Sequence, residues 1–288
     1  MDLNQDEIAR YSRQILIPSF GLESQKKLKN ASVLVIGSGG LGSPVLLYLA
    51  AAGVGRIGIV ENDIVDVSNL QRQILYDEKS KGKNKINIAA ERLIALNENC
   101  IIERHPTRFS RFNAIKITNG YDLIIDGSDN FPTRYLVNDV CEILHKPFVY
   151  GAIHQFEGQV SVFNYKGGVT YRDLFSSPPP EEMAPNCAIA GVLGMMAGIV
   201  GSLQATEAIK ILTGIGEVLS GKLLLIEALS MNFRKIRILR NSERPVITEL
   251  IDYEKFCGLT NDALENISYE SFIALNKEDV QLIDVRER

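Results

Sequence analysis

Short apolar runs alternate with longer amphipathic stretches through the first half of the chain. The runs are rich in Val and Ile, which is typical of buried strands, whereas the stretches between them repeat apolar residues at helical spacing. This alternation favours an α/β fold with a Rossmann-like, mostly parallel sheet covered by helices on both faces. The expected strands are 32–37, 56–61, 101–106, 121–126 and 147–151, and the expected helices are 42–53, 85–97, 111–119 and 132–145.

The pattern changes after Gly151, where further strand-like stretches surround one long apolar helix, expected from about Ala188 to Leu212. We expect these later strands to pair antiparallel. The Pro-rich segment 176–186 is expected to cross between them in a mobile or extended form, because proline suits neither a helix interior nor a central strand. The expected antiparallel strands are 158–165, 223–229 and 233–240.

The chain therefore divides into three expected parts. One domain covers residues 1–245, with a nucleotide-binding half at about 30–150 and an antiparallel half at about 151–240. A linker follows over 246–266, and the stretch 267–288 predicts one helix and one strand. That last piece is too short to fold as a domain by itself.

Composition and charge indicate a globular chain and argue against several classes of partner. The 31 Lys and Arg against 35 Asp and Glu give a net charge of −4, so no bulk basic field favours nucleic acid or an anionic membrane. The N-terminal residues lack the basic start and apolar core of a secretory signal, and we expect a cytoplasmic protein. The most apolar run, Ala188 to Leu203, is shorter than the ~20 residues that span a bilayer.

Cysteine and histidine are scattered along the chain. Cys100, Cys141, Cys187 and Cys257 form no CxxC pair, and the 3 histidines lack metal-ligand spacing. In a cytoplasmic chain these cysteines are expected to be free thiols, and we expect no structural zinc.

The stretch VLVIGSGGLGS predicts a strand, a tight turn and the start of a helix. Its glycines allow the backbone to approach a phosphate, which the free N–H groups of a helix N-terminus attract. Glu61, at the end of the second strand, fits the acidic residue that binds ribose hydroxyls. Both features suit any nucleotide, so an NAD(P)-dependent oxidoreductase stays open at this point. The loop glycines are Gly37, Gly39, Gly40 and Gly42.

Basic and acidic residues further along favour ATP. Arg72 and Lys85 follow the ribose acid and suit a polyphosphate, because cations neutralise phosphate charge and the charge that develops on a pyrophosphate leaving group. Each of them alone is equally compatible with a solvated surface charge. Asp126 and Asp129 end a buried strand, where a carboxylate holds Mg²⁺ on ATP or, alternatively, Asp129 or Asn130 caps the next helix.

Seven motifs occur in an order that resembles the ubiquitin-activating enzyme superfamily. They are RYSRQI, GSGGLGS, SNLQRQ, GKNK, DGSDN, EGQVSVF and GSLQATEAIK, and the likeness covers about Asp6 to Arg240. The chain is most similar to the bacterial molybdopterin-synthase and thiamin sulfur-carrier adenylyltransferases. That resemblance implies that the C-terminal glycine carboxylate of a ubiquitin-like sulfur carrier ending in Gly-Gly attacks the α-phosphate of ATP.

The resemblance also implies roles for individual residues. Arg72 and Lys85 contact the triphosphate, Asp129 binds Mg²⁺, and Arg13 reaches ATP from the other subunit of a homodimer, although by itself Arg13 equally suits a surface charge. The residues expected to bind the nucleotide are Gly37, Gly39, Gly40, Gly42, Glu61, Asp63, Ser68, Asn69, Gln73 and Asn130.

The chain departs from the family pattern at the zinc-binding positions, and two further features, Cys187 and the C-terminal segment, bear on sulfur transfer. The two CxxC pairs that hold zinc in most relatives are replaced by other residues, so the zinc is expected to be lost. Cys187 matches a cysteine that joins the carrier through sulfur in the thiamin branch, which implies a sulfur-relay or thioester role, and it also suits a packing or merely reactive thiol. Residues 267–288 resemble the opening of a rhodanese domain, which implies sulfur chemistry with a cysteine desulfurase or another donor.

A tRNA-modifying dehydratase and a catalytically silent binding module are the alternatives within the superfamily.

Overall fold

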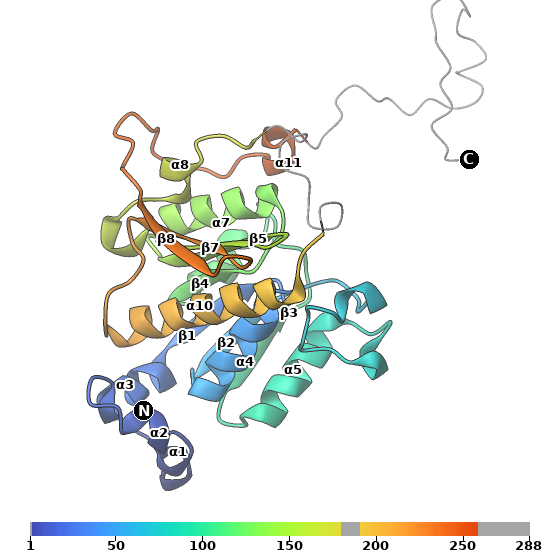
Figure 1. Ribbon diagram of the computed structural model, residues 1–288, viewed down its shortest axis with the longest axis vertical. Coiled ribbons are helices and arrows are strands. Elements are labelled where there is room, and N and C mark those ends of the chain that lie inside the picture. The colour runs from blue at the N-terminus through green and yellow to red at the C-terminus, as the bar shows by residue number, and fades with distance from the viewer. Residues whose placement is uncertain (1, 180–190, 259–288) are drawn as a thin grey trace, which may run out of the picture.

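A single eight-stranded sheet organises the molecule (Figure 1). The computed structural model describes residues 2–179 and 191–258. The strand order is β3-β2-β1-β4-β5-β6-β7-β8; the first five strands are parallel, and the last three pair antiparallel. The α/β fold with an antiparallel half is therefore confirmed. The strands are β1 Ser32–Ile36, β2 Arg56–Val60, β3 Ile101–His105, β4 Leu123–Asp126, β5 Phe148–His154, β6 Glu157–Phe163, β7 Lys222–Glu227 and β8 Asn232–Arg237.

The burial of each strand follows its position in the sheet. All residues of the central strands β1 and β4 are buried, because helices cover both faces of a parallel sheet. Every residue of the edge strand β8 is exposed, and the sequence NFRKIR there mixes charges with apolar residues.

Helices cover the two faces of the sheet. One buried cluster joins α4, α5 and α10 to the sheet, and the other joins α6 and α7 to the opposite face (Figure 1). In the described ranges 2–179 and 191–258, no helix has both the length and the apolar character that a membrane crossing needs. The α-helices are α1 Gln5–Arg10, α2 Ser12–Ile15, α3 Gly21–Asn30, α4 Gly42–Ala52, α5 Lys85–Leu96, α6 Ala114–Asn119, α7 Phe131–Ile143, α8 Tyr171–Leu174, α10 Gly194–Thr213 and α11 Tyr253–Phe256.

The long apolar helix begins later than the sequence predicted. We expected it from about Ala188, but α10 begins at Gly194. Val192 forms a parallel bridge with Gln155, and the Leu193 N–H donates to the Gln155 carbonyl at 3.0 Å. This long-range pairing holds the chain extended just before the helix. Residues 180–190, which include most of the Pro-rich segment and Cys187, lie outside the described residues.

Part of the expected linker packs on the domain. Tyr253, at the start of α11, is buried, and its hydroxyl donates to Asp139 Oδ2 at 2.8 Å. The same carboxylate accepts from Arg172, through Nε at 2.7 Å and an Nη at 2.8 Å. The Asp139 and Arg172 side chains are 1% and 9% exposed, so this is a buried ion pair between α7 and α8 that also holds the C-terminal segment through Tyr253.

Replacing Asp139 with Ala is expected to lower the free energy of unfolding by about 3–5 kcal/mol, because it leaves the Arg172 guanidinium buried without its anion. Urea unfolding followed by circular dichroism measures the change. Asp77→Ala is the control, because Asp77 is exposed, lies 3.9 Å from Arg92 and accepts a hydrogen bond from the Ser80 hydroxyl of its own turn at 2.7 Å, so a smaller loss is expected. Equal losses for the two variants would contradict a structural role for the buried pair.

Candidate nucleotide-binding site

A cavity of about 320 Å³ opens at the carboxyl ends of the parallel strands. Its walls come from the segments after β1, β2 and β4, with further residues after β3 and from α7. This is the end of an open α/β sheet at which ligands bind. Of the expected nucleotide-binding and phosphate-binding residues, those that line it are Gly37, Gly39, Gly40, Glu61, Asp63, Arg72, Gln73, Lys85, Asp129 and Asn130.

The glycine loop turns tightly between β1 and α4. Gly37 has a φ of +89°, and a Cβ there would lie 3.0 Å from the Gly127 carbonyl oxygen of the β4 loop. A Cβ at Gly42 would lie 2.0 Å from the Gly37 oxygen. Gly42 is buried and lies outside the cavity lining, so its absent side chain serves the turn rather than the pocket. Gly39 and Gly40 present backbone to the cavity, as a phosphate loop requires.

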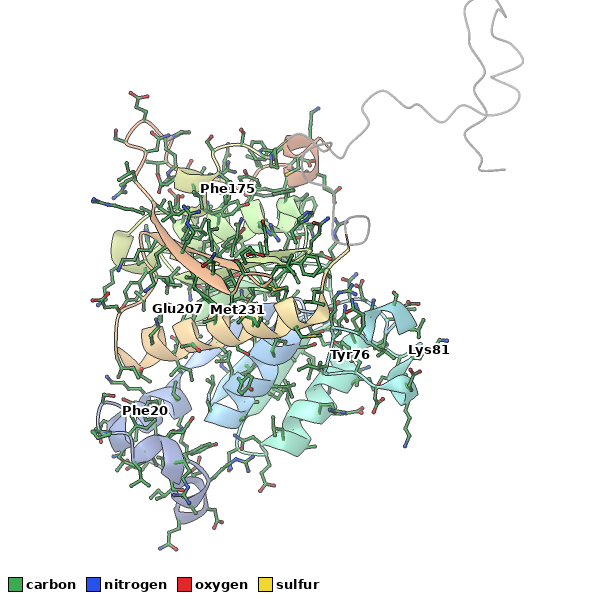
Figure 2. All side chains as sticks on the ribbon, in the orientation of Figure 1. Phe20, Tyr76, Lys81, Phe175, Glu207 and Met231 are labelled. Atoms are coloured by element: carbon green, nitrogen blue, oxygen red, sulfur yellow. The ribbon has the colours of Figure 1, made fainter. Side chains whose placement is uncertain are left out.

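Glu61 accepts hydrogen bonds from the glycine loop and from the segment after β2 through both oxygens of its carboxylate. One oxygen accepts from the Ser38 N–H at 3.0 Å and the Ser38 hydroxyl at 2.9 Å. The other accepts from the N–H groups of Asn62 and Asp63 at 2.8 and 2.9 Å. Tyr76, labelled in Figure 2, is also hydrogen-bonded to the glycine loop, because its hydroxyl donates to the Ser38 carbonyl at 3.0 Å. Glu61 therefore joins the ends of β1 and β2 in addition to any ribose contact.

The two expected phosphate-binding cations are held by neighbours beside the loop. Lys85, the first residue of α5, is 6% exposed at its side chain and lies 3.2 Å from Asp63 Oδ2. Arg72 donates to the Ser68 carbonyl at 3.1 Å, and its side chain passes close to Gly40. The side chains of Arg72 and Lys85 both line the same polar cavity. The position of either residue in the sequence could not by itself distinguish this placement from a solvated surface charge.

Ser68 and Asn69 lie outside the lining of this cavity. The Ser68 hydroxyl donates to Asp66 Oδ1 at 2.6 Å, and Asn69 Oδ1 accepts from the Asp66 N–H at 3.3 Å. These contacts shape the 3₁₀ turn Val67–Asn69, from which Ser68 positions Arg72 through its carbonyl. A direct contact of Ser68 or Asn69 with ATP stays a prediction.

The acidic residues after β4 separate into different roles. Asp126 is fully buried, its Oδ1 accepts from Ser128, and burial raises the pKa of its carboxyl group. Asn130, rather than Asp129, caps α7 by accepting from the Thr133 N–H at 3.0 Å. Asp129 is exposed and lines the cavity, with a 3.4 Å contact from Asn130 Nδ2. Its carboxylate is therefore available to a ligand.

The lining fits an Mg²⁺ ion that arrives with nucleotide phosphates. Within the described part of the chain, no group of three or more His, Cys, Asp or Glu side chains is placed to hold a metal ion. Mg²⁺ needs only one or two carboxylates when phosphates and water complete its coordination. Asp129 supplies such a carboxylate at the edge where the glycine loop presents its backbone.

Arg13 lies far from this cavity in the same chain. It is exposed on α2, and the α1–α3 segment leads directly into the amino end of β1, whereas the cavity lies at the carboxyl end (Figure 1). Arg13 can therefore contact a nucleotide only in another copy of the chain.

Sequence reasoning missed several residues that line the cavity. Thr107, Arg108 and Phe109 follow β3, and their place after a predicted parallel strand was a signal that could have found them. Arg134, in the first turns of α7, follows DGSDN closely but has no motif signal of its own.

The parallel strand order, the tight glycine turn and the cavity beyond it define a nucleotide-binding protein of the doubly wound α/β class. The chain belongs to the ThiF family, whose model matches residues 11–246. It is 48% identical to the probable adenylyltransferase/sulfurtransferase MoeZ of Mycobacterium tuberculosis over 99% of this chain and 76% of that protein. It is 52% identical to the sulfur carrier protein adenylyltransferase of Thermus thermophilus over 90% of this chain and 100% of that protein.

Solved structures with the same fold are more distant in sequence. The structure of E. coli MccB with MccA-N7isoASN has a TM-score of 0.75 at 22% identity and covers 85% of this chain and 76% of that one. MccB with ATP gives a TM-score of 0.72 at 23% identity over 85% of this chain and 75% of that one. These similarities confirm the fold.

Proposed function

We propose that the chain is an Mg-ATP-dependent adenylyltransferase that activates the C-terminal glycine carboxylate of a ubiquitin-like sulfur carrier. The observation that carries this proposal is the cavity itself, where glycine backbone, Lys85, Arg72 and Asp129 meet at the carboxyl ends of the strands. The names of its relatives as adenylyltransferases support the same reaction. Neither of these two relatives is named as an NAD(P)-dependent oxidoreductase.

The reaction needs positioning and charge neutralisation more than a general base. A carboxylate oxygen of the carrier forms a bond to the α-phosphorus, and the bond from that phosphorus to the bridging oxygen breaks. Pyrophosphate leaves with the electron pair, and carrier-AMP remains. The nucleophile is already an anion, so no protein group has to remove a proton. The protein contributes most by holding the two anions together and stabilising the leaving group.

The lining residues divide this work. Gly39 and Gly40 are proposed to offer N–H groups to the phosphates, and Glu61, which lines the same cavity, is proposed to bind the ribose. Arg72 and Lys85 offset the negative charge of the triphosphate and of the departing pyrophosphate. Asp129 would hold Mg²⁺, which when bound neutralises charge on the phosphate oxygens.

Arg13 is proposed to complete the site of a second copy. Arg13 lies towards the amino end of β1 and cannot reach the cavity of its own chain. The role that the family resemblance implies for Arg13 therefore requires a homodimer. Two sites related by a two-fold axis would each receive one Arg13.

The antiparallel half is proposed to bind the carrier. Strands β7 and β8 and the turn between them expose Leu229, Met231 and Phe233, which are 74%, 66% and 50% exposed (Figure 2 labels Met231). An exposed apolar group of this kind suits a protein partner better than solvent. The sulfur donor, a cysteine desulfurase or another source, and the role of Cys187 as relay or as packing thiol stay predictions.

Carrier-dependent ATP–pyrophosphate exchange tests the proposed function. The purified chain with Mg²⁺, ATP and a small carrier ending in Gly-Gly is expected to incorporate labelled pyrophosphate into ATP, and a carrier lacking its last two glycines is expected to give none. Reduced-cofactor fluorescence on addition of NAD(P)H is expected to stay at the background. Exchange that ignores the carrier, or that requires tRNA in its place, would reject the proposal.

Replacing Glu61 with Gln is expected to raise the KM for ATP roughly tenfold, because a charge-assisted hydrogen bond to the ribose is lost. Exchange measured with ATP, 2′-deoxy-ATP and 3′-deoxy-ATP separates this contact from the contacts of Glu61 with the loop. The wild type should discriminate against at least one deoxy analogue, and the variant should discriminate less. Glu61→Ala is expected to raise the ATP requirement further with the dimer intact; an unchanged ATP dependence would count against the ribose role.

A further inference from the structure

Arg134 is a cation of the cavity that forms no ion pair with any residue that the structure describes. It lies on α7 and lines the cavity, and its guanidinium lies 5.6 Å from the ring centres of both Phe131 and Tyr150. Its Nε is buried without a hydrogen-bond partner among the described residues, and no ion pair to Arg134 is present there. Burying such a donor unpaired is costly, which indicates a position prepared for a ligand.

The other basic groups of the lining are already engaged. Lys85 pairs with Asp63 at 3.2 Å, and Arg72 donates to a backbone carbonyl. Arg108 pairs with Glu254 at 2.6 Å. Arg134 differs from all three, because its Nε has no hydrogen-bond partner among the described residues, and the carboxyl groups of Asp126 and Asp129 act on it only through their charge.

Asp126 does not supply the missing anion. Its Oδ2 is buried without a hydrogen-bond partner among the described residues, although Arg134 is close enough for its charge to favour the ionised carboxylate. Burial outweighs that attraction, so the pKa of the Asp126 carboxyl is raised overall. The guanidinium thus keeps hydrogen-bonding capacity for an anion that enters the cavity.

The place of Arg134 within the cavity indicates which anion that is. Tyr150 places β5 beside Arg134, Ile153 of the same strand lines the cavity, and β5 pairs with β6, the first strand of the antiparallel half. Glu61 and Lys85 belong to the segments after β2, which lies on the far side of β1 and β4 in the sheet. A nucleotide bound by the glycine loop, Glu61 and Lys85 therefore leaves Arg134 facing the side on which a protein tail would arrive.

We propose that Arg134 receives the terminal carboxylate of the carrier and orients it for attack on the α-phosphorus; this inference rests on the proposed function. A guanidinium donates to a carboxylate in a fixed planar geometry, and the rings of Phe131 and Tyr150, each centred 5.6 Å from the guanidinium, limit where it can lie. Donation to one carboxylate oxygen leaves the second oxygen to form the bond to phosphorus.

A comparison of two carriers tests the role of Arg134 without relying on turnover. The probes are a sulfur carrier ending in Gly-Gly and the same protein with its C-terminus converted to an amide by peptide ligation, each titrated calorimetrically in the presence of a non-hydrolysable ATP analogue. The wild type is expected to bind the carboxylate form at least about tenfold more tightly, in keeping with a charge-assisted hydrogen bond. Arg134→Gln is expected to bind the two forms alike and to keep the wild-type affinity for the ATP analogue.

Two further variants make the result specific. Arg134→Lys keeps the charge but loses the planar fork, so it should recover part of the preference for the carboxylate, and it carries the test where Arg134→Gln does not fold. Arg92→Gln, which changes an exposed side chain of α5 outside the cavity lining, is the matched control and should retain the full preference.

The possible failures are distinguishable. If Arg134→Gln still prefers the carboxylate form as the wild type does, or if it loses affinity for the ATP analogue instead, the role proposed for Arg134 is overturned while the proposed function stands. If the wild type neither binds the carrier nor exchanges pyrophosphate in its presence, the proposed function itself fails.

Discussion

Replacing Asp129 with Asn is expected to lower carrier-dependent ATP–pyrophosphate exchange by roughly 100- to 1,000-fold, the usual cost of losing one group that stabilises charge in a transition state. Asp129 lines the cavity with an exposed carboxylate. It contributes little to the stability of the fold, because Asn130 is the residue that caps α7. An amide in its place keeps the shape and loses the charge that a magnesium ligand needs. Initial rates over a range of Mg²⁺ concentrations measure the effect.

The Mg²⁺ dependence distinguishes a metal role from a general loss of activity. Asp129→Asn should need a higher Mg²⁺ concentration for half-maximal exchange, with a free energy of unfolding close to that of the wild type. Asp77→Asn changes an exposed carboxylate outside the cavity lining and should alter neither quantity. Wild-type exchange with wild-type Mg²⁺ dependence in Asp129→Asn would remove Asp129 from the proposed site.

The parallel half was readable from the sequence because its strands are short, apolar and buried on both faces. In Val33–Ile36 every side chain is buried, so periodicity and burial point to the same element. The glycine loop then follows from local chemistry, since a φ of +89° at Gly37 and the close approach at Gly42 both exclude a side chain. The meeting of Glu61, Arg72, Lys85 and Asp129 in one cavity follows from parallel strands that end at the same edge.

Other features depend on contacts between distant segments and have no local signal. The start of α10 is set by the pairing of Val192 with Gln155, which belongs to the β5–β6 turn. Tyr253 docks through Asp139, on a helix far earlier in the chain. Arg134 resembles an ordinary helix residue until Tyr150, on a separate strand, is brought over its guanidinium. Local sequence patterns predict helices and strands. Contacts between residues that are far apart in the sequence become known only from the folded structure.

Arg13→Ala is expected to lower exchange about 1,000-fold or more, as loss of an arginine supplied by a neighbouring subunit does in phosphoryl-transfer enzymes. The side chain is exposed on α2 and lies outside the cavity lining of its own chain, so the variant should keep its fold and its free energy of unfolding. A loss of activity in such a variant has its cause at the site of another copy. Arg92→Ala, which removes an exposed arginine of α5, is the matched control and should be as active as the wild type.

Mixing two inactive variants decides whether Arg13 acts across the dimer. In a heterodimer of Arg13→Ala with Asp129→Asn, one site carries both substitutions, and the other receives an intact Arg13 beside an intact Asp129. If subunits exchange freely, half of the dimers are hybrids with one working site of two, so exchange should recover to about a quarter of the wild-type rate. The double variant mixed with wild type provides the reference for subunit exchange. If the mixed single variants stay inactive while their hybrid is seen by native mass spectrometry, Arg13 does not act in trans.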